Sequence, residues 1–192
     1  MMLMALETPT VRTARLVLRP LTVADRADLY ALHTNPRVMR FWDSAPWTDE
    51  AQADRFLARC RALAERGSGV RVALEHRVDG SFLGWIGLQH WDPDTRSANL
   101  GYVLAERAWG QGYASEAARG LLGWAFEATS LNRVSAQPDT RNLASARVLE
   151  KAGFVLEGTM RENVIVGDEV SEDWTYGLLR REWAAALDGA GG

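Results

Sequence analysis

The stretch that most constrains the fold runs from Asn99 to Phe126, NLGYVLAERAWGQGYASEAARGLLGWAF. Apolar and aromatic residues alternate up to Leu104, a pattern that predicts a β-strand. After a loop that contains Gly110 and Gly112, small and apolar residues recur at helical spacing and predict an amphipathic helix. Glycines let the backbone approach a ligand closely, and the free amides at a helix N-terminus favour an anion. The sequence therefore predicts a strand, loop and helix that together bind an anionic group.

The spacing of the glycines excludes two common phosphate-binding loops. A P-loop requires Gly-Lys followed by Ser or Thr, and the sequence contains no such run. A dinucleotide fingerprint would need a third glycine where Ser115 stands, and the strand ends several residues too early. What remains is Arg-x-x-Gly-x-Gly over residues 107–112, which is either an ordinary glycine loop before a helix or a more specific anion site.

The rest of the chain adds strands and helices around this unit. A strand over residues 15–20 precedes two helices, the second of which extends from about residue 48 to Gly67. Three strands within residues 70–104 form an antiparallel meander. After the long helix, a short strand over residues 133–137 is expected to run parallel to the central strand, because a helix joins the two.

The C-terminal part of the pattern is a helix followed by a hairpin. The helix begins at Asn142 and ends before Gly153, which is a natural terminator. The hairpin is expected to have strands over residues 155–160 and 172–179 and a turn at Gly167-Asp168.

Length and composition indicate one domain. The chain has 192 residues of which 47% are hydrophobic, which suits one sizeable core and makes a second full domain improbable. We expect an N-terminal extension over residues 1–12, a single domain over residues 13–184, and a disordered tail over residues 185–192.

Charge and special residues exclude other classes. The net charge is −3 and the basic residues are scattered, so no nucleic-acid partner is expected. The first nine residues lack the features of a signal peptide and no later stretch is long enough for a membrane span, so we expect a cytoplasmic protein with no membrane partner. Cys60 is expected to be a buried or neutral thiol, and the three histidines are too widely spaced for a metal site, so no metal is expected.

The motif at residues 107–112, leading into Tyr113-Ala114, resembles the acetyl-CoA signature of the GCN5-related N-acetyltransferase (GNAT) superfamily, in the branch of the ribosomal-protein N-terminal (RimJ/RimL-type) acetyltransferases. Two further segments carry the resemblance, RLVLRPLTVADRADLYAL near the N-terminus and the Asn-x-x-Ser helix that ends in Lys-x-Gly-Phe at Phe154. The likeness covers roughly residues 13–183. It implies the α/β (α+β) GNAT fold, a twisted, mostly antiparallel sheet with one central parallel strand pair and helices on both faces.

The resemblance also implies acetyl-CoA as the co-substrate. The loop amides would hold the pyrophosphate and Arg107 would add positive charge. The pantetheine arm would pair with the central strand where that strand parts from its parallel neighbour, and Asn142 would orient the arm, although an Asn at this position is also a good helix cap by itself. The cofactor-binding residues expected are Tyr102, Val103, Leu104, Arg107, Gly110, Gln111, Gly112, Tyr113, Ala114, Asn142 and Ser145.

Two departures from the family pattern bear on the proton transfers. Leu149 stands where many relatives have a tyrosine, so Ser145 is the candidate to protonate the departing thiolate, although a thiol with a pKa near 8.5 also leaves without help. Asn99 stands where the branch often has a carboxylate. Glu106 is then the nearest carboxylate, and it is either a base that acts through a water or a solvated loop residue.

Aromatic residues gather in the connection between the first two helices, which is unusual for a loop. In the family this connection walls the acceptor site, which implies an amine pocket shaped by Phe41, Trp42 and Trp47 with Asp43 near the ammonium. Alternatively, the rings close the end of the core. Trp85 and Trp91 are expected in the core.

These features predict an N-acetyltransferase that transfers acetyl from acetyl-CoA to a primary amine. Neither Cys60 nor a Ser-His pair is placed to form an acyl-enzyme, so direct attack in a ternary complex is expected. The acceptor is either a protein N-terminal α-amine or a small-molecule amine, and the aromatic connection suits a small apolar acceptor somewhat better. The alternative is a non-catalytic module that senses acetyl-CoA. A homodimer is possible, since dimers are common in the family.

Overall fold

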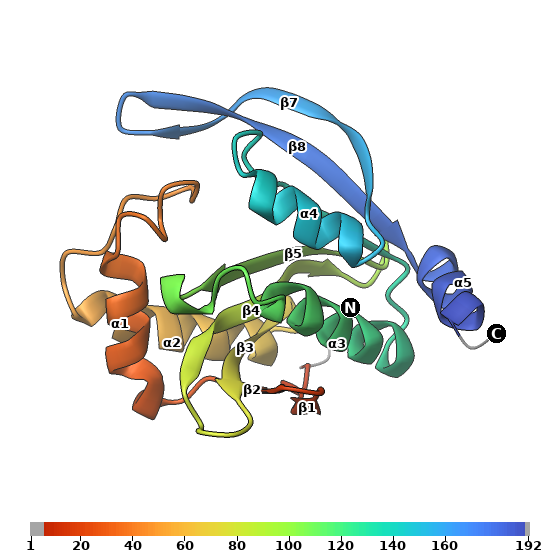
Figure 1. Cartoon of the computed structure of the whole chain (residues 1–192), viewed down its shortest axis with the longest axis horizontal. Helices are drawn as coiled ribbons and strands as arrows, with labels where there is room; N and C mark the ends of the chain where they lie inside the picture. The colour runs from red at the N-terminus through yellow and green to blue at the C-terminus, as the bar shows by residue number, and fades with distance from the viewer. Residues whose placement is uncertain (1–5, 191–192) are drawn as a thin grey trace.

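The computed structural model describes residues 6–190 and shows one eight-stranded sheet with helices on both faces (Figure 1). The strand order is β1-β2-β3-β4-β5-β6-β8-β7. Within the described residues, β5 and β6 are parallel and every other neighbouring pair is antiparallel. The predicted architecture is therefore confirmed.

The predicted elements occur in the expected order, and β1, the two short 3-10 helices and α5 are additional. In chain order, the elements are β1 (Val11–Arg12), β2 (Leu16–Pro20), η1 (Val23–Asp25), α1 (Arg26–Thr34), α2 (Ala51–Glu65), β3 (Gly69–His76), β4 (Phe82–Asp92), β5 (Ser97–Leu104), η2 (Glu106–Ala108), α3 (Tyr113–Ala128), β6 (Arg133–Ala136), α4 (Leu143–Lys151), β7 (Val155–Val166), β8 (Glu169–Leu179) and α5 (Arg180–Ala190). No helix in this part of the chain is long and apolar enough to cross a membrane.

The predicted end of the first hairpin strand and the predicted start of the second are wrong. The strands β7 and β8 continue to Val166 and from Glu169, because residues with mostly exposed side chains still pair through their backbones. The helix α5 extends to Ala190, within the segment 185–192 for which disorder stays a prediction. Residues 191–192 of that segment, and residues 1–5 of the N-terminal extension, lie outside the described residues.

Side-chain alternation along the central strands divides the core into two layers. One layer packs the sheet on α3 and α4 and includes Ile86, Leu121 and Leu149. The other packs the opposite face on α1 and α2 and includes Phe56 and Trp85. Figure 1 shows these two helix pairs on either side of the sheet. The two layers matter for function because a ligand on one face of β5 is separated by the sheet from a ligand on the other face.

Trp85 and Trp91 are buried in these layers, as predicted, with 2% and 8% of their surface exposed. Cys60 is a free, buried thiol on α2, and burial raises its pKa, so the predicted buried or neutral thiol is confirmed.

A buried histidine organises the layer between the sheet and α1. The ring of His33 stacks on Trp47 with 4.1 Å between the ring centroids. Its Nε2 accepts a hydrogen bond from Nε1 of Trp85 at 3.0 Å. Burial, together with the nearby charges of Arg71 and Arg59, lowers the pKa of His33 to about 4. His33 is therefore neutral at physiological pH and fastens the start of α2 to the sheet.

This burial makes stability sensitive to acid. The unfolded chain binds a proton at His33 near pH 6.5 whereas the native state resists it down to about pH 4, so this contribution is complete above pH 6.5 and is lost as the pH falls toward 4. The loss corresponds to about 3 kcal/mol of unfolding free energy. His33→Gln keeps a hydrogen-bond acceptor for Trp85 but cannot take up a proton. We therefore expect its unfolding free energy, measured by urea titration, to change less between pH 6.5 and pH 5 than that of the wild type. Equal slopes for the variant and the wild type would contradict this assignment.

Candidate active site

The loop between η2 and α3 presents a row of unpaired backbone amides. Gly110 and Gly112 adopt positive φ angles of 72° and 80°, and Gly112 is the residue that precedes the first turn of α3. Within residues 6–190, the N–H groups of residues 110–115 have no protein acceptor. The side chain of Trp109 anchors the loop by donating to the carbonyl of Leu104 at 2.9 Å. The predicted loop thus has the geometry that an anion requires.

The central strand loses its partner just before this loop. The parallel register pairs Ser97, Ala98 and Asn99 with residues 133–135 and stops there, while β5 continues to Leu104 beside β4. Beyond Asn99, backbone groups on one edge of β5 are therefore left for a ligand. This is the place where the sequence predicted that the pantetheine arm would pair with Tyr102, Val103 and Leu104.

A tyrosine and a serine meet at this opening. The hydroxyl of Tyr102 lies 2.7 Å from Oγ of Ser145, and it also lies 3.3 Å from the carbonyl oxygen of Ser145. Asn142 caps α4 by accepting from the N–H of Ser145 at 3.1 Å. Burial raises the pKa of Tyr102 to about 12, so its phenol stays protonated and acts as a hydrogen-bond donor.

Sequence reasoning gave Tyr102 only a backbone role. The signal that could have found its side chain is the alternation of β5, which places Tyr102 on the same face of the sheet as α4. The structure brings Tyr102, Asn142 and Ser145 together at one point beside the opening.

Glu106 and Arg107 point elsewhere. Glu106 forms an ion pair with Arg37 at 2.5 Å, and Asn35 donates to it at 3.5 Å. Arg107 donates to the carbonyl of Phe82. Both residues line a pocket of about 150 Å³ beside α1, on the opposite side of β5 from Ser145. The guanidinium of Arg107 therefore does not point toward the glycine loop, where positive charge was expected. Glu106 is paired with Arg37, so it is poorly placed to act as a base.

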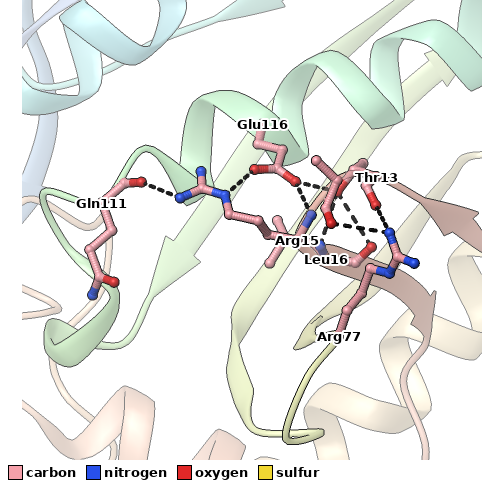
Figure 2. A network of polar contacts seen from close by, with 7 residues as sticks. Thr13, Arg15, Leu16, Arg77, Gln111 and Glu116 are labelled. Carbon is pink, nitrogen blue, oxygen red and sulfur yellow. Dashed lines mark hydrogen bonds and ion pairs between the residues drawn. The ribbon is translucent and has the colours of Figure 1, made fainter.

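An arginine that the sequence did not single out occupies the loop instead. Arg15, in the turn between β1 and β2, donates from Nη1 to the carbonyl of Gln111 at 2.9 Å and from Nε to Glu116 at 2.7 Å (Figure 2). Its guanidinium also lies over the ring of Tyr113, 4.5 Å from the centroid. Spacing along the chain could not reveal these contacts, because about a hundred residues separate Arg15 from Gln111 and Glu116.

The predicted acceptor residues divide into two groups. Trp47 is buried and stacks on His33, so it closes the end of the core. Trp42 packs edge-on against Trp85 and lies 3.9 Å from the position that a side chain on Gly101 would occupy, beside the opening of β5. Phe41 and Asp43 belong to the same connection.

Phe41 and Asp43 face the C-terminal half of the sheet. The ring of Phe41 lies under the guanidinium of Arg141 at 5.7 Å. Asp43 is exposed, and burial together with the carboxylates of Asp139 and Asp43 raises the pKa of Asp173 on β8. The connection therefore approaches β8 and contributes negative charge on that side.

Asn99 is held in a neutral hydrogen-bonded group. Its Oδ1 accepts from Oγ of Ser135 at 2.7 Å, and its Nδ2 donates to Gln137 at 3.3 Å. This group lies at the last paired position of β5 and β6. The carboxylate expected at this position in the branch is thus replaced by polar groups that carry no charge.

Comparison with known proteins identifies the class of site. The model of the acetyltransferase (GNAT) domain matches residues 15–155, so the chain belongs to the GNAT family of acetyltransferases. The uncharacterized N-acetyltransferase YoaA of Bacillus subtilis is 32% identical over 90% of this chain and 97% of its own length. The predicted family and enzyme class are confirmed, and the protein is an N-acetyltransferase that uses acetyl-CoA.

Two solved structures share the fold at lower identity. A spermidine N-acetyltransferase from Vibrio cholerae, in complex with CoA and spermine, has a TM-score of 0.80 and 19% identity and covers 90% of this chain and 99% of its own. RimL, a ribosomal L7/L12 α-N-protein acetyltransferase in complex with CoA, has a TM-score of 0.79 and 20% identity and covers 89% of this chain and 98% of its own. These likenesses extend to the fold alone.

Substitution of the loop glycine tests the cofactor site. We expect Gly112→Glu to weaken CoA binding by about a hundredfold or more, because any side chain is strained at this positive φ and the carboxylate repels the phosphates. Calorimetric titration with CoA measures the effect. Gly123→Glu is the matched control, since it adds the same charge to α3 at a position with open space around it. Wild-type affinity in Gly112→Glu would contradict the assignment of the loop.

Proposed function

We propose that this protein transfers the acetyl group of acetyl-CoA directly to a primary amine, with Ser145 as the proton donor to the thiolate. The observation that carries the proposal is the position of the Tyr102–Ser145 pair beside the edge of β5 that β6 leaves open. The pyrophosphate lies on the amides of residues 110–114, and the pantetheine amides pair with β5 as an added strand would. This arrangement puts the thioester next to Ser145.

The reaction needs one new bond, one broken bond and two proton movements. The neutral amine attacks the thioester carbon, and a backbone N–H of β5 that β6 no longer engages stabilises the oxyanion. Collapse of the intermediate breaks the C–S bond, and Ser145 relays a proton from solvent to the departing sulfur by giving up its own proton and taking another from water. In this mechanism Tyr102 is the donor of the 2.7 Å hydrogen bond to Oγ of Ser145, so the serine proton is free to point at the sulfur. The proton of the amine passes to water and then to bulk solvent.

The lack of a strong general base in the site favours acceptors whose amine is already partly neutral. Asn99 is neutral and Glu106 is paired with Arg37, so neither strongly assists deprotonation. An α-amine with a pKa near 8 is partly neutral at pH 7, whereas a lysine or polyamine nitrogen near 10.4 is almost fully charged. We therefore propose an α-amino acceptor. Trp42 beside the opening suits an apolar group next to that amine, on a small molecule or at a protein N-terminus.

A panel of amines tests this function. We expect CoA release from acetyl-CoA with apolar α-amino compounds or N-terminal peptides, and kcat/KM at least about tenfold lower for polyamines and lysine ε-amines, because the neutral fraction of those amines is so small at pH 7. The ratio of kcat/KM for α-amines to kcat/KM for polyamines should fall as the pH is raised to 9. A preference for polyamines at pH 7 would contradict the proposed acceptor class, and no turnover with any amine in a broad panel would contradict the proposed transfer.

Variants of the Tyr102–Ser145 pair test the proton donor. We expect Ser145→Ala to lower kcat about ten- to a hundredfold with little change in KM for acetyl-CoA, since the hydroxyl acts after binding. Tyr102→Phe should lower kcat about tenfold, and the double variant should be no slower than Ser145→Ala because Tyr102 acts through Ser145. Tyr30→Phe in α1 is the control for loss of a phenol. Additive losses in the double variant would show that Tyr102 acts independently of Ser145.

A further inference from the structure

The turn between β1 and β2 clamps the first turn of α3. Thr13 Oγ1 and the backbone N–H of Arg15 both donate to Oε1 of Glu116, at 2.6 and 2.7 Å, while Nε of Arg15 donates to Oε2 at 2.7 Å. Burial acts to raise the pKa of Glu116, but these hydrogen bonds outweigh it and lower the pKa overall. Glu116 is therefore ionised. A negative charge one turn inside α3 would oppose an anion at the loop unless a cation neutralises it.

Arg15 supplies that cation, and its guanidinium also extends past Glu116 to the glycine loop. Nη1 is bound to the carbonyl of Gln111, and the guanidinium covers Tyr113, so Arg15 touches residues on both sides of Gly112. A methyl group placed on Gly112 would lie 3.5 Å from Nη2. Within residues 6–190, Nη2 donates no hydrogen bond to the protein. Nη2 therefore lies beside Gly112, and Figure 2 shows the guanidinium of Arg15 between Gln111 and Glu116.

The position of Arg15 is fixed before any ligand arrives. Nη1 of Arg77 donates to the carbonyls of Thr13 and Ala14 at 2.7 and 3.1 Å. The backbone N–H of Arg77 donates to the carbonyl of Arg15 at 2.9 Å. The hairpin between β3 and β4 thus holds the turn from one side while Glu116 holds it from the other. A side chain held in place in this way loses little conformational freedom when it binds a ligand.

We propose that Arg15 binds the pyrophosphate of acetyl-CoA through Nη2, alongside the amides of the glycine loop. The proposal rests on the function proposed above only in the use of acetyl-CoA. It gives Arg15 the role that the sequence pattern suggested for Arg107, whose guanidinium is bound to the carbonyl of Phe82 instead. Arg15 then has two tasks, to neutralise Glu116 and to hold the phosphates, and these tasks can be separated by experiment.

A double-mutant cycle separates the two tasks. CoA binding is measured by calorimetry for wild type, Arg15→Gln, Glu116→Gln and the double variant. We expect Arg15→Gln to weaken binding about ten- to a hundredfold, as loss of a charge-assisted hydrogen bond does, and Glu116→Gln to bind at least as well as wild type. The double variant should remain at least about tenfold weaker than Glu116→Gln. If the double variant binds as tightly as Glu116→Gln, Arg15 only neutralises Glu116 and the proposal is wrong.

Truncated ligands identify the group that Arg15 contacts. The same proteins are titrated with 3′-dephospho-CoA and with pantetheine, which lacks all phosphates. We expect the loss in Arg15→Gln to be the same for CoA and 3′-dephospho-CoA and absent for pantetheine. A loss that disappears with 3′-dephospho-CoA would place Arg15 on the 3′-phosphate, and an equal loss for pantetheine would show general damage to the site. Either result would overturn the proposal.

A charge-conserving variant covers the case in which Arg15→Gln does not fold. Arg15→Lys keeps a cation beside Glu116 but lacks the two-pronged guanidinium, so we expect weaker CoA binding with a melting temperature near that of wild type. Wild-type affinity in Arg15→Lys would show that a point charge suffices and would overturn the role of Nη2. All these measurements use binding alone. Failure to acetylate any amine would therefore contradict the proposed function without affecting this inference, and failure of wild type to bind CoA would contradict both.

Discussion

The structure depends on a strand in the middle of a sheet that has no partner along half of one edge. Backbone N–H and C=O groups at such a position must be satisfied by protein, water or a ligand. The pairing of β5 with β6 ends at Asn99. After β6 the chain follows β8, where the backbone N–H of Trp174 donates to the carbonyl of Pro138 at 2.9 Å. The opening is therefore stabilised by β8 rather than by strain in β5. A cofactor arm that carries amides can complete the sheet there, which links the fold directly to the use of acetyl-CoA.

The electrostatics around the glycine loop depend on one half-buried carboxylate, Glu116, in the first turn of α3. Glu116 ties Thr13 and Arg15 to the helix and so fixes how the N-terminal strands meet it. The same carboxylate would weaken an anion site by itself, and the guanidinium of Arg15 compensates for it locally. The loop amides and the cation beside them are thus held by contacts that also stabilise the fold. A pre-formed site of this kind needs little rearrangement to bind phosphates.

Local sequence signals predicted the fold and the position of the glycine loop but not the long-range contacts. Alternation placed the strands, and Gly110 and Gly112 marked the loop correctly because both require positive φ. The directions of side chains in irregular segments could not be predicted, so Arg107 was expected at the phosphates although it binds Phe82. Trp47 was left between two interpretations because it lies in a loop and its partner, His33, lies in helix α1. The extension of β7 was missed because its side chains are mostly exposed and carry no apolar pattern.

The two faces of β5 explain how the proposed reaction avoids an acyl-enzyme. Tyr102 faces α4 together with Ser145, whereas Gly101 faces Trp42 on the other side of the sheet. In the proposed mechanism the thioester lies at the open edge of β5, the thiolate is protonated from the α4 side, and the amine arrives from the side of Trp42. Because Gly101 has no side chain, the strand leaves room there beside Trp42 and Gln89, each of which would lie 3.9 Å from a methyl group at this position. The acceptor and the leaving group therefore meet the same carbon from different sides, and direct transfer needs no nucleophile from the protein.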